Sequence, residues 1–222
     1  MPEYRLSTID NPKSLTAEVY RTLRTNIQFV SIDTVVKSIL FTSAIPREGK
    51  SSVVANLATS MSQAGKNVLI IDADLRKPSQ HKIFDLPNLT GLTTTLVSNV
   101  SAFEHIVETK HEGLDILTAG PNPPNPAELL DSQRMKQLLH ELTQAYELVL
   151  VDSPPVIAVT DATILAQSVD GVILVVAAKE VKREYALEAK ERLKKVEARL
   201  LGVILNKVKL QSKEQNYYSY YS

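Results

Sequence analysis

The chain has 222 residues, of which 44% are apolar, and this is enough to bury the core of one large α/β domain. Its 25 Lys and Arg residues equal its 25 Asp and Glu residues, so the net charge of zero gives no support for a nucleic-acid partner. Because the sequence has no cysteine, a disulfide framework and a thiolate metal site are both excluded.

The first predicted element is an amphipathic helix over about residues 14–31. Apolar side chains recur along it in steps of four, at Leu15, Val19, Leu23 and Ile27. This spacing predicts one buried stripe. On the opposite side, steps of three place Glu18, Arg21 and Arg24 on one outward ridge. Such a ridge is either solvated surface with an ordinary ion pair or a contact surface, and spacing alone favours the first.

A predicted strand, Ser38–Ser43, leads into the loop AIPREGKS and then into a helix that starts near Lys50 and that Gly65 can end. The loop closes as the phosphate-binding pattern G-x-x-x-x-G-K-[ST] does. There, backbone N–H groups and the helix N-terminus hold phosphate oxygens, the lysine reaches the β- and γ-phosphates, and the serine hydroxyl ligates Mg²⁺. The sequence therefore predicts an ATP and Mg²⁺ site formed by Ala44, Ile45, Pro46, Arg47, Glu48, Gly49, Lys50, Ser51 and Ser52.

Ala44 stands where the pattern has its first glycine, which restricts the loop without forbidding it. The alternative interpretation is a Lys-Ser pair that happens to start an amphipathic helix. The strand before the loop and the helix after it favour nucleotide binding.

The next predicted strand covers residues 67–71 and runs into two acids, Asp72 and Asp74. Alternation along an extended chain places both side chains on one side, at the strand end where open α/β sheets bind ligands. Beside a triphosphate, such carboxylates ligate Mg²⁺, directly or through water, or accept a proton from an attacking hydroxyl. The alternative is a helix-capping aspartate with a surface neighbour.

A third acid, Asp152, follows the strand predicted over residues 147–151. In P-loop proteins such an aspartate orients a water on Mg²⁺. The predicted catalytic residues are therefore Lys50, Asp72, Asp74 and Asp152, and the predicted metal ligands are Ser51 and the same three acids. Asn206 ends the last predicted strand, over residues 201–205, where it could meet the adenine edge or cap a turn.

The remaining segments continue the alternation of strands and helices. Helices are expected at Leu92–Val97, 102–108, 162–167 and 182–199, and strands at Leu114–Leu117 and 171–176. Because the strands are continuously apolar, we predict a mainly parallel sheet that is covered on both faces.

The segment after the last strand is polar and lacks apolar periodicity, so we expect it to be disordered in isolation. It holds four of the 8 tyrosines: Tyr217, Tyr218, Tyr220 and Tyr221. A sticky tail or a docking segment for another protein would be the plain explanations.

The combination of motifs resembles a known family. AIPREGKS, IDADLRKP, TAGPNPPNP, LVLVDSPP and the tyrosine cluster are similar to the motifs of bacterial tyrosine kinases. The resemblance is strongest to the cytoplasmic autokinase subunits of capsular and exopolysaccharide systems in Gram-positive bacteria. It implies a P-loop NTPase sandwich of three layers, in the MinD/ParA-like group with a deviant first motif.

The resemblance also implies roles for residues. Glu18, Arg21 and Arg24 match the element E-x-x-R-x-x-R, which joins subunits into a ring such as an octamer. The tyrosine cluster would be phosphorylated between subunits. A transmembrane adaptor of the polysaccharide co-polymerase type would activate the kinase, a protein-tyrosine phosphatase would act on it, and other protein substrates are compatible with the family.

Two positions are informative departures. Arg47 stands where the family usually has glycine, and it either adds positive charge at the phosphates or points to solvent. Relatives that act as MinD/ParA-like ATPases carry a lysine five residues before the loop lysine, and Ile45 stands there. This counts against the rival interpretation, a nucleotide-dependent oligomerisation switch. A non-enzymatic ATP sensor is the other rival.

The expected organisation is one kinase domain over residues 1–210 and a tyrosine-rich tail over residues 211–222. The N-terminal segment lacks the apolar core of a signal peptide, and no apolar run approaches the ~20 residues that span a bilayer. We therefore expect a cytoplasmic protein that reaches the inner face of the membrane only through its adaptor.

Overall fold

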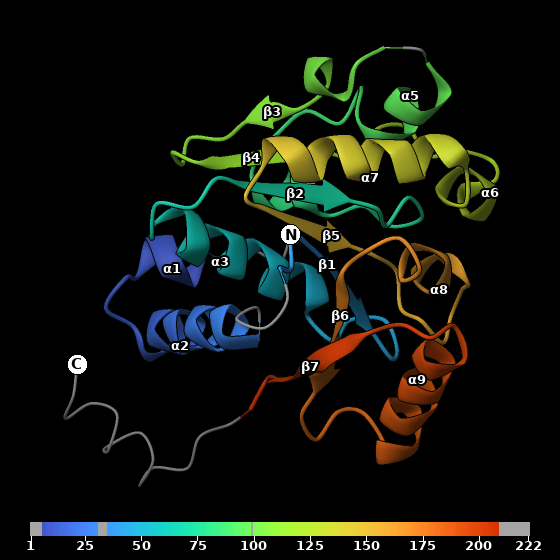
Figure 1. Ribbon diagram of the computed structural model, residues 1–222. Helices are drawn as coiled ribbons and strands as arrows, with labels where there is room; N and C mark the ends of the chain where they lie inside the picture. The colour runs from blue at the N-terminus through green and yellow to red at the C-terminus, as the bar shows by residue number, and fades with distance from the viewer. Residues whose placement is uncertain (1–5, 31–34, 99, 209–222) are drawn as a thin grey trace, which may run out of the picture.

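A computed structural model describes residues 6–30, 35–98 and 100–208. Its centre is a sheet with the strand order β3-β4-β2-β5-β1-β6-β7 (Figure 1). The strands are β1 Ser38–Ser43, β2 Val68–Asp72, β3 Val107–Glu108, β4 Leu114–Leu117, β5 Leu148–Asp152, β6 Gly171–Ala177 and β7 Leu200–Asn206. All neighbouring strands are parallel except β3, which pairs antiparallel with β4. The predicted mainly parallel sheet is confirmed.

Helices cover the two faces of this sheet and make three layers (Figure 1). One face carries α1 Ser7–Asp10, α2 Leu15–Val30, α3 Lys50–Ser62 and α4 Gln80–Ile83. The other carries α5 Leu92–Val97, α6 Pro126–Leu130, α7 Gln133–Ala145, α8 Asp161–Leu165 and α9 Arg183–Lys195. Each face packs its own apolar core, because alternate residues of the buried strands point to opposite sides. None of the helices in the described ranges is long and apolar enough to cross a bilayer.

Helix α2 forms as predicted, but only part of the predicted stripe is buried: Ile27 belongs to the core and Leu23 packs against it. Ala17 and Ile27 are buried, whereas Val19 is 51% exposed. The stripe borders a groove between α2 and β7, where Val203 and Leu205 are 57% and 59% exposed. The prediction that helices cover both faces is therefore wrong at β7, because α2 leaves this edge strand partly open.

Two predicted helices have different bounds. Within residues 102–108, only Ala102–Glu104 forms a short 3₁₀ helix, and Val107–Glu108 is the edge strand β3, which pairs with β4. Helix α9 ends at Lys195 rather than at residue 199. Glu197 adopts a left-handed backbone with φ of 56°, and the Ala198 N–H donates to the Leu193 carbonyl oxygen at 3.1 Å. This turn ends the helix without a glycine, so sequence patterns gave no signal for it.

Candidate functional site

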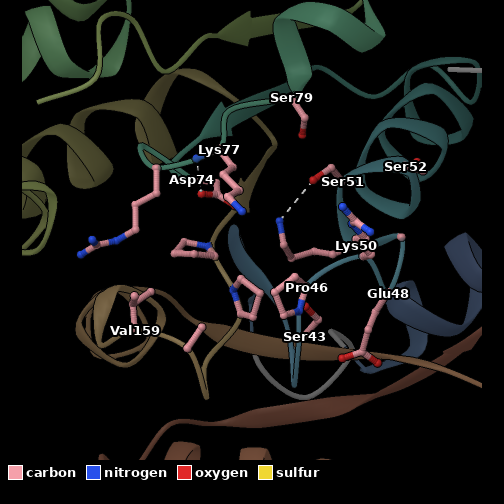
Figure 2. A pocket seen from close by; sticks show the side chains of 16 residues that line it. Ser43, Pro46, Glu48, Lys50, Ser51, Ser52, Asp74, Lys77, Ser79 and Val159 are labelled. Atoms are coloured by element: carbon pink, nitrogen blue, oxygen red, sulfur yellow. Dashed lines mark hydrogen bonds between the residues drawn. The ribbon is translucent and has the colours of Figure 1, made fainter. Parts of the chain in front are cut away.

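A cleft of about 480 Å³ lies at the carboxyl ends of β1, β2 and β5. This is the edge at which open α/β sheets bind ligands. Figure 2 shows Lys50, Ser51, Asp74 and Lys77 pointing toward one common space. The lining residues come from the end of β1, the loop before α3, the first turn of α3, and the segments after β2 and β5: Ser43, Pro46, Arg47, Glu48, Gly49, Lys50, Ser51, Ser52, Asp74, Arg76, Lys77, Ser79, Pro154, Pro155, Ala158 and Val159.

The loop before α3 turns through two left-handed residues. Arg47 has φ of 68°, and Gly49, the N-cap of α3, has φ of 84°. A left-handed backbone favours glycine, which explains why a glycine would suit position 47. Arg47 adopts this conformation with an exposed side chain that lines the cleft. Ala44 and Ile45, which the sequence also predicts as part of the nucleotide site, do not line the cleft.

The sequence predicts that Glu48 helps to bind the nucleotide, but its carboxylate points away from the cleft. It is buried, and its two oxygens accept the backbone N–H groups of Ile45 and Ala177, both at 2.7 Å. Asn206 adds a second tie from β7, because its Nδ2 donates to the Glu48 carbonyl oxygen at 2.8 Å. These bonds fix the loop to the ends of β6 and β7. Asn206 thus contacts the loop and is not among the lining residues.

Lys50 and Asp152 form a buried ion pair at the inner wall of the cleft. Lys50 Nζ contacts Asp152 Oδ1 and donates to Ser51 Oγ at 3.2 Å. The other Asp152 oxygen, Oδ2, accepts a hydrogen bond from Gln80 Nε2 at 2.7 Å. The cation of the loop and the acid of β5 therefore meet in the folded protein.

The two acids at the end of β2 have different surroundings, although alternation along the strand predicts their side chains on one side. Asp72 is fully buried, and its Oδ2 accepts the N–H groups of Ser79 and Gln80, both at 2.9 Å, at the start of α4. It thus serves α4 as a cap. Burial raises its pKa to about 7, and repulsion from Asp152, its register partner on β5, adds to the rise.

Asp74 is the acid that lines the cleft. Its Oδ1 accepts the Lys77 N–H at 3.0 Å. Burial raises its pKa above the usual range, and the positive charge of Lys50 opposes the rise. This position suits an acid that faces a ligand.

A family model described as ParA: NUBPL iron-transfer P-loop NTPase matches residues 34–221. The tyrosine-protein kinase YwqD of Bacillus subtilis (strain 168) is 49% identical over 210 residues, which are 95% of this chain and 88% of the relative. This chain belongs to the bacterial tyrosine-protein kinases. The fold class is that of the ParA-like P-loop NTPases, as predicted.

Solved structures agree with this assignment of the kinase. The chimerical protein CapA2B2 matches with a TM-score of 0.88 and 41% identity, covering 92% of this chain and 90% of that chain. The kinase domain of the Escherichia coli tyrosine kinase ETK matches with a TM-score of 0.87 and 32% identity, covering 93% and 83%. The rival interpretation, an oligomerisation-switch ATPase, is not favoured, because these relatives are named tyrosine kinases.

Two residues of the kinase site were missed by sequence reasoning. Gln80 reaches Asp152, as described above. Asp161, fully buried in the first turn of α8, accepts the Nε and Nη2 of Arg76 at 2.9 and 3.0 Å. It therefore holds this cleft-lining arginine by both of its oxygens. No sequence pattern links these positions, because each contact joins elements that only the sheet brings together.

The ridge on α2 is only partly outward. Arg21 donates to Glu18 Oε2 at 2.6 Å, an ordinary surface ion pair between residues three positions apart. Arg24 turns toward α3, where its Nη1 donates to the Ser60 carbonyl oxygen at 2.7 Å. The three side chains therefore do not form one outward row, because Arg24 turns inward to the Ser60 carbonyl oxygen. The predicted acceptors Tyr217, Tyr218, Tyr220 and Tyr221 lie outside the described residues.

The chemistry of the cleft fits a nucleotide with Mg²⁺. Cationic Arg47, Arg76 and Lys77 line it together with Lys50, and the Glu48 carboxylate is turned to backbone donors. Within the described ranges, no group of three His, Cys, Asp or Glu side chains is arranged to hold a metal ion by itself. Proteins hold Mg²⁺ through one or two ligands, waters and the phosphates of the substrate, and Ser51 and Asp74 offer side-chain oxygens at this cleft.

Proposed function

We propose that this kinase transfers the γ-phosphoryl group of ATP to tyrosines of the terminal cluster on a neighbouring copy of the chain. The observation that carries the proposal is the cleft, in which Lys50, Ser51 and Asp74 face one space beside the phosphate loop. Membership of the bacterial tyrosine-protein kinases supports the reaction class. The division into a catalytic part, residues 1–210, and an acceptor tail, residues 211–222, belongs to this proposal.

The chain's own groups have separate tasks in this reaction. Bound Mg-ATP would supply the phosphoryl group, and the metal would neutralise its charge. Ser51 and Asp152 would hold the metal, while Lys50 would place its ammonium at the phosphates. The tyrosine Oη forms a bond to phosphorus, the bond from phosphorus to the ADP oxygen breaks, and Asp74 takes the phenol proton.

Asp74 is the favoured base because it lines the cleft, whereas the Asp72 carboxylate is occupied by backbone N–H groups. Asp72 then acts by fixing the segment that carries Asp74 and Gln80. Asn206 contacts the adenine edge in this proposal, in addition to donating its hydrogen bond to the loop.

Membership of the bacterial tyrosine-protein kinases also supports proposals about the proteins that this kinase contacts. The kinase forms a homo-oligomeric ring through α2, and a transmembrane adaptor activates it at the inner face of the membrane. A protein-tyrosine phosphatase removes the phosphates. The cycle controls the synthesis and export of a capsular or exopolysaccharide.

Replacing Lys50 with Met should abolish phosphotyrosine, because the substitution removes the cation that neutralises the phosphates. The measurement is mass spectrometry of the last ten residues after incubation with Mg-ATP. Lys66→Met, which removes a surface lysine paired with Glu147, is the matched control and should keep full labelling. Undiminished labelling of Lys50→Met would contradict the site, and free phosphate without labelled tyrosine would select the ATPase.

Transfer between chains has its own test. The Lys50→Met chain is mixed with an active chain that lacks residues 211–222, so that only the inactive chain carries acceptor tyrosines. Label on the inactive chain is expected. An unlabelled inactive chain would refute transfer between subunits.

A further inference from the structure

Gln80 lies beneath the cleft, between the side chains of Asp72 and Asp152. It is fully buried at the first position of α4. Its side-chain Nε2 donates to Asp152 Oδ2 at 2.7 Å and to the Ser51 carbonyl oxygen at 3.2 Å, while its backbone N–H donates to Asp72 Oδ2 at 2.9 Å. One residue thus links the phosphate loop, the end of β2 and the end of β5.

The amide of Gln80 has a defined orientation. An ionised carboxylate only accepts hydrogen bonds, so the side of the amide that meets Asp152 must be its NH₂ group. The carbonyl oxygen Oε1 then lies on the other side of the amide. It is buried and has no hydrogen-bond partner among the residues that the structure describes. Buried polar atoms usually have a partner, so this acceptor suggests a ligand in the complete site.

The residues beside Gln80 indicate which ligand. The two partners of its side chain are the residues that hold Mg²⁺ in P-loop proteins: Ser51, the serine after the loop lysine, and Asp152, the acid at the end of β5. Protein-bound Mg²⁺ keeps several waters, and these waters donate hydrogen bonds. Groups that orient metal ligands from behind change metal affinity by about 10–100-fold when they are replaced.

We propose that Gln80 is a positioning residue of the metal site: its amide N–H holds Asp152, and its unpaired Oε1 accepts a hydrogen bond from hydrated Mg²⁺. This inference rests on the proposed function, because it requires the cleft to hold a nucleotide with Mg²⁺. It adds a residue that acts on the metal through Asp152 and the waters.

The test measures binding of a fluorescent ADP analogue in EDTA and across a Mg²⁺ titration, without any turnover. Gln80→Met keeps the unbranched shape of the side chain but removes both the donor and the acceptor. We expect an unchanged affinity in EDTA and a Mg²⁺ half-saturation concentration raised by about tenfold. Gln63→Met, the same substitution at the end of α3, removes an amide that donates to the Thr8 carbonyl oxygen and should leave both values unchanged.

The outcomes separate the inference from the function on which it rests. If the unchanged kinase binds the analogue without response to Mg²⁺, the proposed metal site itself fails. If it responds and Gln80→Met responds at the same Mg²⁺ concentration, only the role of Gln80 fails. Equal weakening in EDTA and in Mg²⁺ would assign Gln80 a purely structural role. Gln80→Leu repeats the test if the Met variant does not fold, and failure of both to fold would also assign a structural role.

Discussion

At the scale of single residues, the main finding is that Asp72 and Asp74 differ although they are two positions apart. Asp72 lies in register with Asp152 on the neighbouring strand, and backbone N–H groups occupy its oxygen Oδ2. Asp74 lies two residues beyond the end of β2 and lines the cleft. The alternation of an extended chain predicts that both carboxylates lie on the same side of the sheet. It cannot predict that α4 would start beside Asp72 and donate its backbone N–H groups to that carboxylate.

The raised pKa of Asp72 gives a prediction for stability against pH. In the unfolded chain the group titrates near 3.8, whereas in the folded protein its pKa is raised to about 7. Between these values the folded protein binds the extra proton, so this group makes the free energy of unfolding fall as pH rises from about 4 to about 7, by at most about 1.4 kcal/mol per pH unit.

Replacing Asp72 with Asn should remove this contribution, and urea unfolding from pH 4.5 to 8 measures it. The difference in free energy of unfolding between variant and unchanged protein should therefore grow in favour of the variant as pH rises. Asp131→Asn, at an exposed aspartate that follows α6, serves as control. A difference that does not depend on pH would contradict the buried titration.

At the scale of elements, the phosphate loop owes its shape to contacts from outside it. Glu48 ties the loop to the end of β6, and Asn206 ties it to the end of β7. Lys207 adds a bond from its Nζ to the Arg47 carbonyl oxygen at 2.9 Å. These bonds hold a loop that contains an arginine in a left-handed conformation.

Glu48→Gln should loosen the loop and destabilise the fold. The NH₂ group of glutamine cannot accept a backbone N–H, so either the Ile45 or the Ala177 donor loses its partner, at a cost of about 1–3 kcal/mol. Urea unfolding measures this loss, and nucleotide affinity should fall with it. The control is Glu180→Gln at the exposed pair with Lys207, for which we expect a change below about 1 kcal/mol. Equal effects of the two variants would contradict the role of Glu48.

The loop also shows which features of the site a local sequence pattern can predict. The order strand, G-K-S and helix is local, so the pattern predicts the position of the loop and of Lys50 and Ser51. The direction of the Glu48 carboxylate depends on Ala177, which is 129 residues away, and no local pattern carries that information. For the same reason Gln80 and Asp161 were missed, because their partners become neighbours only in the folded sheet.

At the scale of the whole molecule, α2 and β7 leave an open face. The groove between them is lined by apolar residues, including exposed Val19, Val203 and Leu205. Glu18 also lines the groove, and it is paired with Arg21. This supports the proposal that α2 contacts another subunit, although Arg24 bonds within its own subunit.

Arg21→Glu tests this contact at a surface position, because Glu18, the ion-pair partner of Arg21, is 59% exposed. The substitution also removes the hydrogen bond from Arg21 Nη2 to the Pro12 carbonyl oxygen at 2.6 Å, so we expect the free energy of unfolding to fall by about 1 kcal/mol. We expect the folded variant to elute as a smaller assembly than the unchanged kinase at equal concentration. Arg134→Glu, at the surface pair with Glu141 on α7, is the matched control and should elute with the unchanged kinase. Co-elution of Arg21→Glu with both would refute a subunit contact through α2.

The strand order has a consequence for synthesis of the chain. β5 lies between β2 and β1, so the strand that ends in Asp152 is inserted between two strands that leave the ribosome much earlier. A nascent chain that has emerged only as far as β4 already contains the phosphate loop but lacks the acid that pairs with Lys50. The cleft of the incomplete protein therefore lacks its buried ion pair until the strand that ends in Asp152 has been synthesised.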